Sequence, residues 1–594
     1  MTEQANKILK TYFGYNSFRN GQKEAILDII DNKDVLAIMP TGAGKSICFQ
    51  VPAVIFSGIT IVISPLISLM KDQVDSLNEI GIRSTFINST LDNYEITNRI
   101  NQMKSGIYKL LYIAPERLES ESFIQEFDKI DISFVAVDEA HCISQWGHDF
   151  RPSYSQITKF INKIKPRPVI GAYTATATET VRDDIIHLLR LRKPNIYVTG
   201  FDRPNLHFSV LKGENRDKFI LSYVSKNKDD TGIIYTSTRR EADSIFNLLM
   251  KNEINVGLYH AGLSDKERIS SQNKFAYDDI NVMVATNAFG MGIDKSNVRY
   301  VIHNNIPKNM EAYYQEAGRA GRDGEKSECI LLFAPKDIQL QAYFIDESSV
   351  SKERKENEYE KLRAMVDYCH TSECLRKYIL KYFSDNMGSE TCGNCGNCND
   401  TREQEDITLI AKMIFSCIYR MNQRFGSGMI ADVLKGSSNK KVMVGRFNRL
   451  TTYGIMKEYA RKDILDWINK LAADNFLSLT NDGYPVLKLT KKALAVLSGE
   501  ESVKAKGAVK VAQKIDMDNE LFENLRILRK NIAIREKVPP YIVFSDVSLK
   551  EMCSLLPRSK DEFLNVKGVG EVKFDRYGQK FLTCIGDYVD SKMG

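Results

Sequence analysis

Residues 35–46 read Val-Leu-Ala-Ile-Met-Pro-Thr-Gly-Ala-Gly-Lys-Ser, an apolar run that passes into a glycine-containing turn. The run predicts a buried strand, and the sequence after Ser46 favours a helix. The glycines let the backbone curl, so that several N–H groups face a phosphate at the helix N-terminus. In this pattern Lys45 reaches the β and γ phosphates of a nucleotide, and Ser46 holds Mg²⁺. The strict pattern has glycine where this chain has Met39, which leaves an ordinary strand-to-helix turn as the alternative.

Short apolar runs alternate with longer amphipathic stretches on both sides of this turn. The same alternation begins again near residue 232. Alternation of this kind predicts parallel sheets covered by helices. We therefore expect an α/β protein with two tandem domains, 1–204 and 205–345, which meet near Asp202. The expected strands are 35–38, 60–63, 110–113 and 134–137 in the first domain, and 232–235, 282–285 and 300–303 in the second.

Strand-like runs largely disappear after residue 345, where charged, helix-favouring sequence takes over. Residues 346–403 contain a cluster of cysteines. Residues 501–518 are basic and poor in large side chains, which is typical of a linker. Residues 519–594 have helical periodicity of their own, enough for one small all-α bundle.

Residues 404–500 predict a small helical domain that ends in one hairpin. Residues 476–480 and 486–490 alternate like two strands around Asn481-Asp482-Gly483, a hairpin turn signal.

Length and composition limit the classes of protein. A chain of 594 residues is too long for one core, so several compact units are expected. Charges interrupt every apolar run, which argues against a membrane span, and the N-terminus lacks the pattern of a signal peptide. We expect a cytoplasmic protein. The net charge of +6 permits nucleic-acid binding without proving it.

Asp138 and Glu139 follow directly after the apolar run 134–137. An aspartate at the tip of a buried strand beside a phosphate-binding turn can position Mg²⁺. The adjacent glutamate can orient or deprotonate an attacking water. An acidic pair alone is usually a solvated strand end, but its place after a buried strand favours a catalytic pair.

Arg319 and Arg322 lie in a glycine-containing segment of the second domain, residues 315–324. Two arginines three residues apart share one face if the segment is helical. They can reach across a cleft between the domains to a γ-phosphate, where charge develops during phosphoryl transfer. A basic surface helix is the alternative, and the flanking glycines argue against it.

Four cysteines, Cys374, Cys392, Cys395 and Cys398, have a spacing that suits one tetrahedral ion. Zn²⁺ is the expected metal, and a closed set of four thiolates indicates a structural role. Disulfides are the weaker explanation in a cytosolic chain.

The ordered set of motifs resembles the superfamily 2 helicases, and several details resemble the RecQ family. The most discriminating stretch is residues 142–152, Cys-Ile-Ser-Gln-Trp-Gly-His-Asp-Phe-Arg-Pro, which is similar to the aromatic-rich loop of RecQ proteins. The other similar stretches are residues 12–22, 64–73, 174–178 and 285–294. The resemblance implies two RecA-like domains, a zinc-binding subdomain (346–403), a winged-helix domain (404–500) and an HRDC domain (519–594).

For the nucleotide, the resemblance implies that Tyr15 and Arg19 sandwich the adenine while Gln22 hydrogen-bonds its edge. An aromatic face, a guanidinium and an amide suit a purine on physical grounds as well. Asn20 stands where the family often has proline. Asp294 is expected near the ribose. The phosphate loop comprises Thr41, Gly42, Ala43, Gly44, Lys45 and Ser46.

For DNA, the resemblance points to Trp146, Phe150 and Arg151 in the aromatic-rich loop, and to Ser68 in the first domain. Trp146 and Phe150 can stack on bases, although a core tryptophan is the alternative for Trp146. The residues expected in the accessory domains are Lys440, Lys441, Arg446 and Arg449 in the winged helix, with Tyr484 near the wing tip, and Lys567, Lys573 and Arg576 in the HRDC domain. A protein-docking bundle with a solvated basic face is an equal alternative for the HRDC domain.

The resemblance also selects Cys374, rather than its neighbour Cys369, as the first zinc ligand. It implies an ATP-dependent DNA helicase that uses Mg²⁺ and one structural Zn²⁺ and travels 3′ to 5′ in recombination, repair and replication-fork processing. Single-stranded and forked DNA are the expected partners, with single-strand-binding protein and topoisomerase. The rival functions are a DNA-stimulated translocase that separates no strands, a catalytically dead DNA-binding scaffold, and an RNA helicase.

Overall fold

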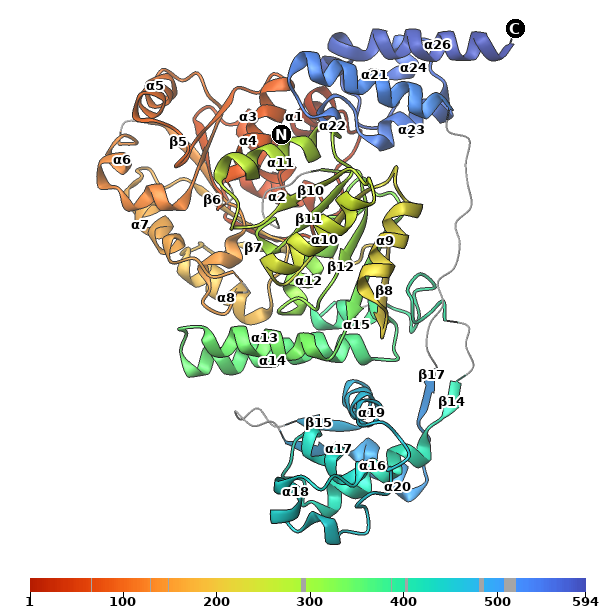
Figure 1. Cartoon of the computed structure of the whole chain (residues 1–594). Coiled ribbons are helices and arrows are strands. Elements are labelled where there is room, and N and C mark those ends of the chain that lie inside the picture. Colours follow the sequence, from red (N-terminus) through yellow and green to blue (C-terminus); the bar gives the residue numbers. More distant parts are fainter. Residues whose placement is uncertain are drawn as a thin grey trace.

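The computed structural model describes residues 1–65, 67–128, 130–147, 149–289, 295–385, 387–400, 404–479, 486–506 and 520–593. Two sheet domains form the body of the molecule, with a helical bundle on one side of them and a smaller domain on the other (Figure 1). In the part of the chain that is described, no helix is long and apolar enough to span a lipid bilayer.

The first sheet domain is a parallel sheet of order β3-β4-β2-β5-β6-β1-β7. The side chains of its central strands alternate between two cores, which α1–α4 cover on one face and α5–α8 on the other. Its strands are β1 (Val35–Ile38), β2 (Ile59–Ile63), β3 (Ser84–Ile87), β4 (Leu110–Ile113), β5 (Ile132–Val137), β6 (Val169–Thr174) and β7 (Asn195–Val198). Its helices are α1 (Thr2–Ile8), α2 (Gln22–Ile30), α3 (Ile47–Ile55), α4 (Ile67–Glu79), α5 (Asn93–Lys104), α6 (Glu121–Gln125), α7 (Ser155–Lys163) and α8 (Glu179–Leu188).

The second sheet domain is a parallel sheet of order β10-β11-β9-β12-β13-β8. One face packs under α9 and α10, and the other joins the core of the first sheet domain in one continuous apolar cluster. Its strands are β8 (Leu206–Lys212), β9 (Thr231–Tyr235), β10 (Val256–Tyr259), β11 (Val282–Ala285), β12 (Val298–His303) and β13 (Ser327–Phe333). Its helices are α9 (Arg216–Lys226), α10 (Arg239–Lys251), α11 (Asp265–Ala276) and α12 (Met310–Ala317).

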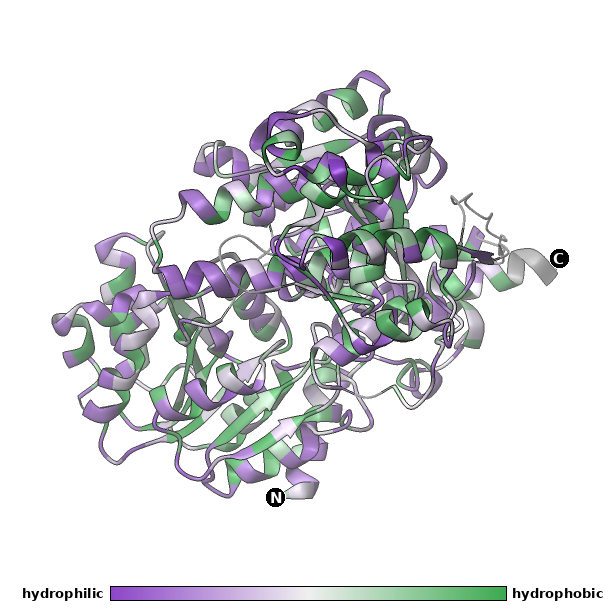
Figure 2. Cartoon of the chain, turned by 90° about the horizontal axis from the view of Figure 1, so that it is seen from below, coloured by the Kyte–Doolittle hydropathy of each residue, from purple (hydrophilic) through white to green (hydrophobic). Residues whose placement is uncertain are grey.

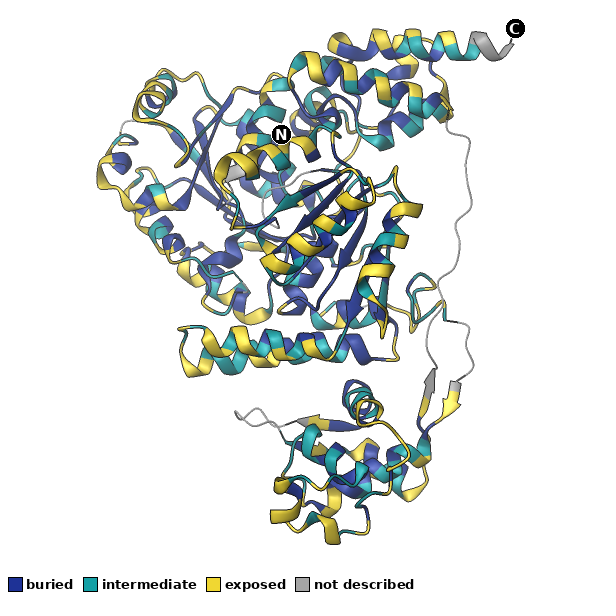
Figure 3. Cartoon of the chain, in the orientation of Figure 1, coloured by how far each residue is buried: buried dark blue, intermediate teal, exposed yellow. Residues whose placement is uncertain are grey.

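Every strand expected from the sequence coincides with or lies within an observed strand, namely β1, β2, β4, β5, β9, β11 or β12. The other strands of the two sheets were not among those expected. Figure 2 shows the apolar strands inside the polar helices, and Figure 3 shows the same strands as the most buried part of the chain. Strands buried on both faces read as continuous apolar runs, which is why they were visible in the sequence.

A helical cysteine region follows, with α13 (Lys336–Glu347), α14 (Lys352–His370) and α15 (Leu375–Tyr382). Its apolar side chains belong to the same cluster as the two sheets, so it extends the second sheet domain. Phe383 stacks on Phe201 with ring centroids 4.6 Å apart, which ties the region to the segment between the sheets.

The hairpin domain has its own core and lies away from the C-terminal end of the chain (Figure 1). The hairpin pairs β15 (Leu477–Leu479) with β16 (Leu487–Leu489), as predicted, and Tyr484 lies outside the described residues. A second pair, β14 (Gln404–Asp406) with β17 (Lys504–Lys506), means that the expected linker 501–518 begins as a strand of this domain. Its helices are α16 (Thr408–Arg420), α17 (Ser427–Lys435), α18 (Lys440–Val444), α19 (Arg461–Ala473) and α20 (Lys491–Ser498).

The C-terminal bundle (520–593) has a separate core and lies against the first sheet domain, near the N-terminus (Figure 1). Its elements are α21 (Glu520–Glu536), α22 (Pro540–Val543), α23 (Asp546–Leu555), α24 (Lys560–Phe563), α25 (Glu571–Lys573), the short π-helix Phe574–Gly578 and α26 (Gln579–Met593).

Candidate functional site

The turn between β1 and α3 has the curled backbone that the sequence predicts. Gly42 and Gly44 have φ of 82° and 84°, a left-handed conformation that glycine adopts without strain. Lys45 is partly buried, and its ammonium donates a hydrogen bond to the Met39 carbonyl at 3.1 Å. Burial lowers the pKa of Lys45, and the nearby carboxylates of Glu139 and Asp138 oppose that shift. A cation without a carboxylate in direct contact is suited to hold an incoming phosphate.

The acidic pair lies at the carboxyl end of β5, two strands from the turn. Ser64 and the Glu139 backbone N–H both donate to the Asp138 carboxylate, at 3.4 and 3.0 Å. Glu139 has φ of 47°, an uncommon conformation for a residue with a side chain, and such strain concentrates at functional sites. Burial raises the pKa of Asp138, and its neighbour Glu139 adds to that shift.

His141 connects this pair to the next strand. Its Nδ1 lies 3.3 Å from a Glu139 carboxylate oxygen and 2.9 Å from the Thr174 hydroxyl at the end of β6. Burial by itself raises the pKa of Glu139, but the hydrogen bond from His141 and the charges of His141, Lys45 and Arg319 outweigh it and lower the pKa. Glu139 is therefore held as a carboxylate in a partly buried place, as a proton acceptor needs to be.

Arg319 and Arg322 of the second sheet domain line the same cavity as Lys45 and Glu139. They lie in a turn rather than on a helix, because α12 ends at Ala317 and Gly321, between the two arginines, takes φ of 54°. The Nε atom of Arg319 is buried with no hydrogen-bond partner among the described residues. A buried guanidinium with spare donors fits a polyanionic ligand.

The cavity between the two sheets measures about 600 Å³, within the range of ligand sites. Tyr15, Arg19 and Gln22 line it beside the phosphate loop, as expected for a purine site. The Gln22 amide donates to the carbonyls of Ala43 and Gly44 at 2.9 and 3.1 Å, and Arg19 donates to that of Gly42 at 2.5 Å. Both side chains thus contact the phosphate loop directly. Asp294 lies outside the described residues.

Sequence reasoning missed Arg203, which joins the two halves of the cavity. Its guanidinium donates to the Thr41 carbonyl of the phosphate loop at 2.5 Å and to the Ala320 and Gly321 carbonyls at 3.0 and 2.8 Å. Burial lowers its pKa. The only signal was its position, directly before a proline at the boundary between the two domains.

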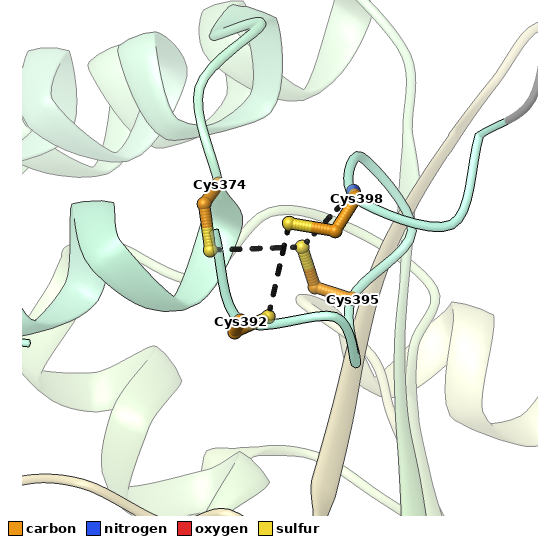
Figure 4. Close-up of side chains that lie close together, drawn as sticks. All are labelled: Cys374, Cys392, Cys395 and Cys398. Carbon is orange, nitrogen blue, oxygen red and sulfur yellow. Dashed lines mark hydrogen bonds between the residues drawn. The ribbon is translucent and has the colours of Figure 1, made fainter. Parts of the chain in front are cut away.

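The four predicted cysteines lie together, and their sulfur atoms are all within 4.8 Å of one another (Figure 4). The Sγ pairs Cys392–Cys398 and Cys395–Cys374 are both 3.9 Å apart. A tetrahedron with Zn–S bonds of ~2.3 Å has edges of about 3.8 Å, so the four thiols fit one zinc ion. Cys369 is buried in the neighbouring core and is not part of this group.

Backbone amides and two asparagines support the cysteine cluster. The N–H groups of Lys377, Asn394 and Cys398 point at the sulfurs of Cys374, Cys392 and Cys395, at 3.3–3.4 Å. The Asn397 amide donates to the Thr371 and Glu373 carbonyls at 2.9 and 2.7 Å, and the Asn394 amide to that of Pro204 at 3.1 Å. The Gly396 N–H donates to Phe208 at 2.8 Å, which fixes the cluster to the edge strand β8.

The aromatic-rich loop runs from the acidic pair to the surface beside α14. Trp146 is half-buried, so it is not a fully enclosed core residue, and Lys361 donates to its carbonyl at 2.9 Å. The Arg354 guanidinium lies 5.5 Å from the centre of the Phe150 ring. Arg151 contacts Asp149 and the Pro65 carbonyl. Nothing is described of the Ser68 side chain.

The basic side chains of the accessory domains have different surroundings. Lys440, Lys441, Arg446 and Arg449 are exposed on the hairpin domain, around the start of α18 and the turn after it. The basic side chains of the C-terminal bundle instead face the first sheet domain. Lys573 is partly buried there, Arg576 pairs with Glu79, and the exposed Lys567 lines the nucleotide cavity. This differs from the expected open surface, because the bundle is docked.

Sequence models of five protein families match the chain in succession. They are a DEAD/DEAH box helicase domain (residues 19–184), a helicase conserved C-terminal domain (215–324), a RecQ zinc-binding domain (335–399), an RQC domain (401–514) and an HRDC domain (518–585).

Curated relatives match over nearly the whole chain. The ATP-dependent DNA helicase RecQ of Bacillus subtilis is 52% identical over 99% of this chain and 99% of its own length. The protein of the same name from Pasteurella multocida is 40% identical over 98% of this chain and 94% of its own length. The Haemophilus influenzae protein is 38% identical over 98% and 96%.

Proposed function

The chain belongs to the RecQ family of helicases, and on that premise we propose that it is an ATP-dependent DNA helicase that hydrolyses ATP between its two sheet domains. One observation supports this above all others. Lys45, the acidic pair and both arginines, from two separate domains, line one cavity of nucleotide size.

Each side chain has a role that follows from its surroundings. Lys45 and the backbone of the phosphate loop bind the β and γ phosphates. Ser46 and Asp138 would hold Mg²⁺, which would neutralise phosphate charge. Glu139 accepts a proton from the attacking water. Arg319 and Arg322 stabilise the charge that develops on the γ-phosphate. The arginines belong to the second sheet domain, so hydrolysis requires the cleft to be closed.

The aromatic-rich loop is suited to report DNA occupancy to this site. The loop begins three residues after Glu139, and α14 of the cysteine region holds its far side through Lys361 and Arg354. A base that stacks on Trp146 or Phe150 would pull on a segment joined directly to the catalytic pair. We propose that single-stranded DNA crosses both sheet domains, while the hairpin domain holds the duplex ahead through its exposed lysines and arginines.

The direction of travel is tested with forked DNA that carries a single-stranded tail on one side. We expect 3′-tailed forks to open and 5′-tailed forks to stay closed, as the family resemblance implies. Trp146→Ala should lower the stimulation of ATPase by single-stranded DNA about tenfold or more, since stacking contributes ~1–3 kcal/mol per base. Tyr94→Ala, a change to an exposed aromatic on α5 of the first sheet domain, serves as the control.

Three outcomes would contradict parts of this proposal. ATPase that responds to DNA while no fork opens would favour the translocase. Equal stimulation by RNA and DNA would favour an RNA helicase. Full stimulation of ATPase by DNA in the Trp146 variant would show that the loop does not couple DNA binding to ATP hydrolysis. Single-strand-binding protein and topoisomerase stay predicted partners.

Arg203 is expected to position the arginine-bearing turn. Arg203→Ala removes donors to the carbonyls of Thr41, Ala320 and Gly321 at once. We predict that it lowers kcat of ATP hydrolysis by about 100-fold, because a displacement of about 1 Å in a catalytic group costs that much. Nucleotide affinity should change little. Arg203→Lys should recover only part of the loss, since an ammonium cannot reproduce the planar fork. A kcat within threefold of wild type in Arg203→Ala would contradict this role.

A further inference from the structure

The C-terminal bundle forms part of the wall of the nucleotide cavity. Tyr541, Ser545 and Ser548 line the cavity together with Lys567 and Gly568 of the loop before α25. The phosphate loop and the purine-binding residues line the same cavity. The cavity therefore has part of its wall from a domain that lies hundreds of residues away in the sequence.

Two glycines permit this docking. The Gly568 N–H donates to the Gly14 carbonyl at 3.2 Å. A Cβ at Gly14 would lie 2.6 Å from the Gly570 nitrogen, and a Cβ at Gly570 would lie 2.9 Å from the Thr11 carbonyl oxygen. Both distances are too short for any side chain. The loop thus contacts the segment that carries Tyr15 backbone to backbone.

Charged contacts fix the bundle to the first sheet domain beside this loop. Arg576 pairs with the Glu79 carboxylate at the end of α4 and donates to its carbonyl at 2.8 Å. The Tyr577 hydroxyl donates to the same carboxylate at 3.0 Å. Lys573 is partly buried beside this contact. Desolvation there lowers the pKa of Lys573 to about 8, while Glu79 opposes the shift.

A second set of charges fixes the bundle to the second sheet domain. Arg529 is buried and lies 3.8 Å from Asp278, and Lys530 lies 3.2 Å from Asp279. Lys550 pairs with Glu325, which follows the arginine-bearing turn. The bundle therefore bridges the two domains whose cleft must open and close, and that motion must break at least one side of the contact.

We propose that the C-terminal bundle is a removable cap on the nucleotide cavity. The phosphates of DNA compete with the carboxylates of the two sheet domains for the basic side chains of this cap. This rests on the proposed function, because it assumes that the cavity holds the nucleotide during the cycle. Exposed ion pairs are weak, typically ~0–1 kcal/mol each, so a polyanion can replace them. Bound DNA and a docked cap exclude one another, because Arg576, Lys530 and Lys550 bind either the DNA phosphates or the carboxylates of the sheet domains.

A charge-swap series on the full chain tests the cap without any need for hydrolysis. Glu79→Arg and Arg576→Glu each place like charges together and should raise the association rate of a fluorescent ADP analogue by about three- to tenfold. The double variant restores an opposite pair and should return the rate toward wild type. Lys580→Glu, an identical charge change on the exposed face of α26, should have no effect. Lys550→Glu with Glu325→Lys repeats the design on the second sheet domain.

Amide exchange supplies the structural readout. The amides of residues 9–14 and of Gly568 should exchange faster in each single variant, and also in the wild type when a single-stranded oligonucleotide is added. The cap would be contradicted if the single variants bound the ADP analogue as slowly as Lys580→Glu, or if the double variant kept the raised association rate. If the amides of residues 9–14 and of Gly568 stayed protected at saturating oligonucleotide, competition between DNA and the docked cap would be contradicted. Nucleotide association and amide exchange both depend on binding alone. A protein that failed to hydrolyse ATP or to open forks would contradict the proposed function, but these two measurements would still test the cap.

Discussion

Glu139→Gln is expected to lower the turnover of DNA-stimulated ATP hydrolysis by about 10²- to 10⁴-fold, the contribution of a positioned proton acceptor. The amide has the shape of the carboxylate but cannot take a proton from water. His141 and the backbone at φ of 47° hold this side chain in place, so the substitution should leave the site assembled. Turnover is measured at saturating ATP and single-stranded DNA.

Retained binding separates lost chemistry from lost structure. The Kd for a fluorescent ATP analogue should stay within about threefold of wild type, since Lys45 and the phosphate loop carry most of the contacts. Glu214→Gln, the same change at an exposed loop position of the second sheet domain, should leave turnover unchanged. A Glu139→Gln protein that turns over within tenfold of wild type would show that another group accepts the proton.

The hydrogen bonds around Glu139 explain why the site should respond to events at a distance. His141 contacts both Glu139 and Thr174, so the proton acceptor is tied to the end of β6, inside the stretch 174–178. The Tyr154 hydroxyl donates to the Asp138 carbonyl at 2.8 Å from beyond the aromatic-rich loop. A shift of that loop therefore reaches the acidic pair through two short paths, one along the chain and one through Tyr154.

Local patterns in the sequence predicted the features that depend on neighbouring residues. The strand at 35–38, the curl at Gly42 and Gly44, and the acidic pair are each determined within about ten residues. The cysteine group was predictable because thiolate spacing directly reflects the geometry of one ion. These features needed no knowledge of how distant segments pack.

Contacts between distant segments were not predictable in the same way. Nothing around Arg203 indicates that its guanidinium reaches both Thr41 and Gly321. The sequence allows a helix at Arg319, because the turn at Gly321 depends on hydrogen bonds with the distant residues Asn205 and Val298. The sequence favours a DNA contact for Lys573, because only the docking of the bundle places it in the wall of the nucleotide cavity. Each of these depends on tertiary packing that overrides local preference.

Replacing Cys395 should cause the largest structural loss. Its sulfur is fully buried, its neighbour Gly396 pairs with β8, and the four thiols fit a closed zinc site. We expect Cys395→Ser to abolish zinc binding and to destabilise the cysteine region by several kcal/mol, because the binding free energy of a structural zinc is also folding free energy. Zinc content is measured by elemental analysis, and stability by thermal unfolding and by protease sensitivity of residues 346–400.

Cys369→Ala is the matched control, because Cys369 is buried a few residues from Cys374 but lies outside the sulfur cluster. It should keep its zinc and lose only the packing of one small side chain. Chelation of the wild type should reproduce the Cys395→Ser state. Since Asn394 holds the Pro204 carbonyl next to Arg203, loss of the ion should also loosen the turn that joins the two sheet domains and lower ATPase. Zinc retained in Cys395→Ser, or lost in Cys369→Ala, would show that the ligand set is different.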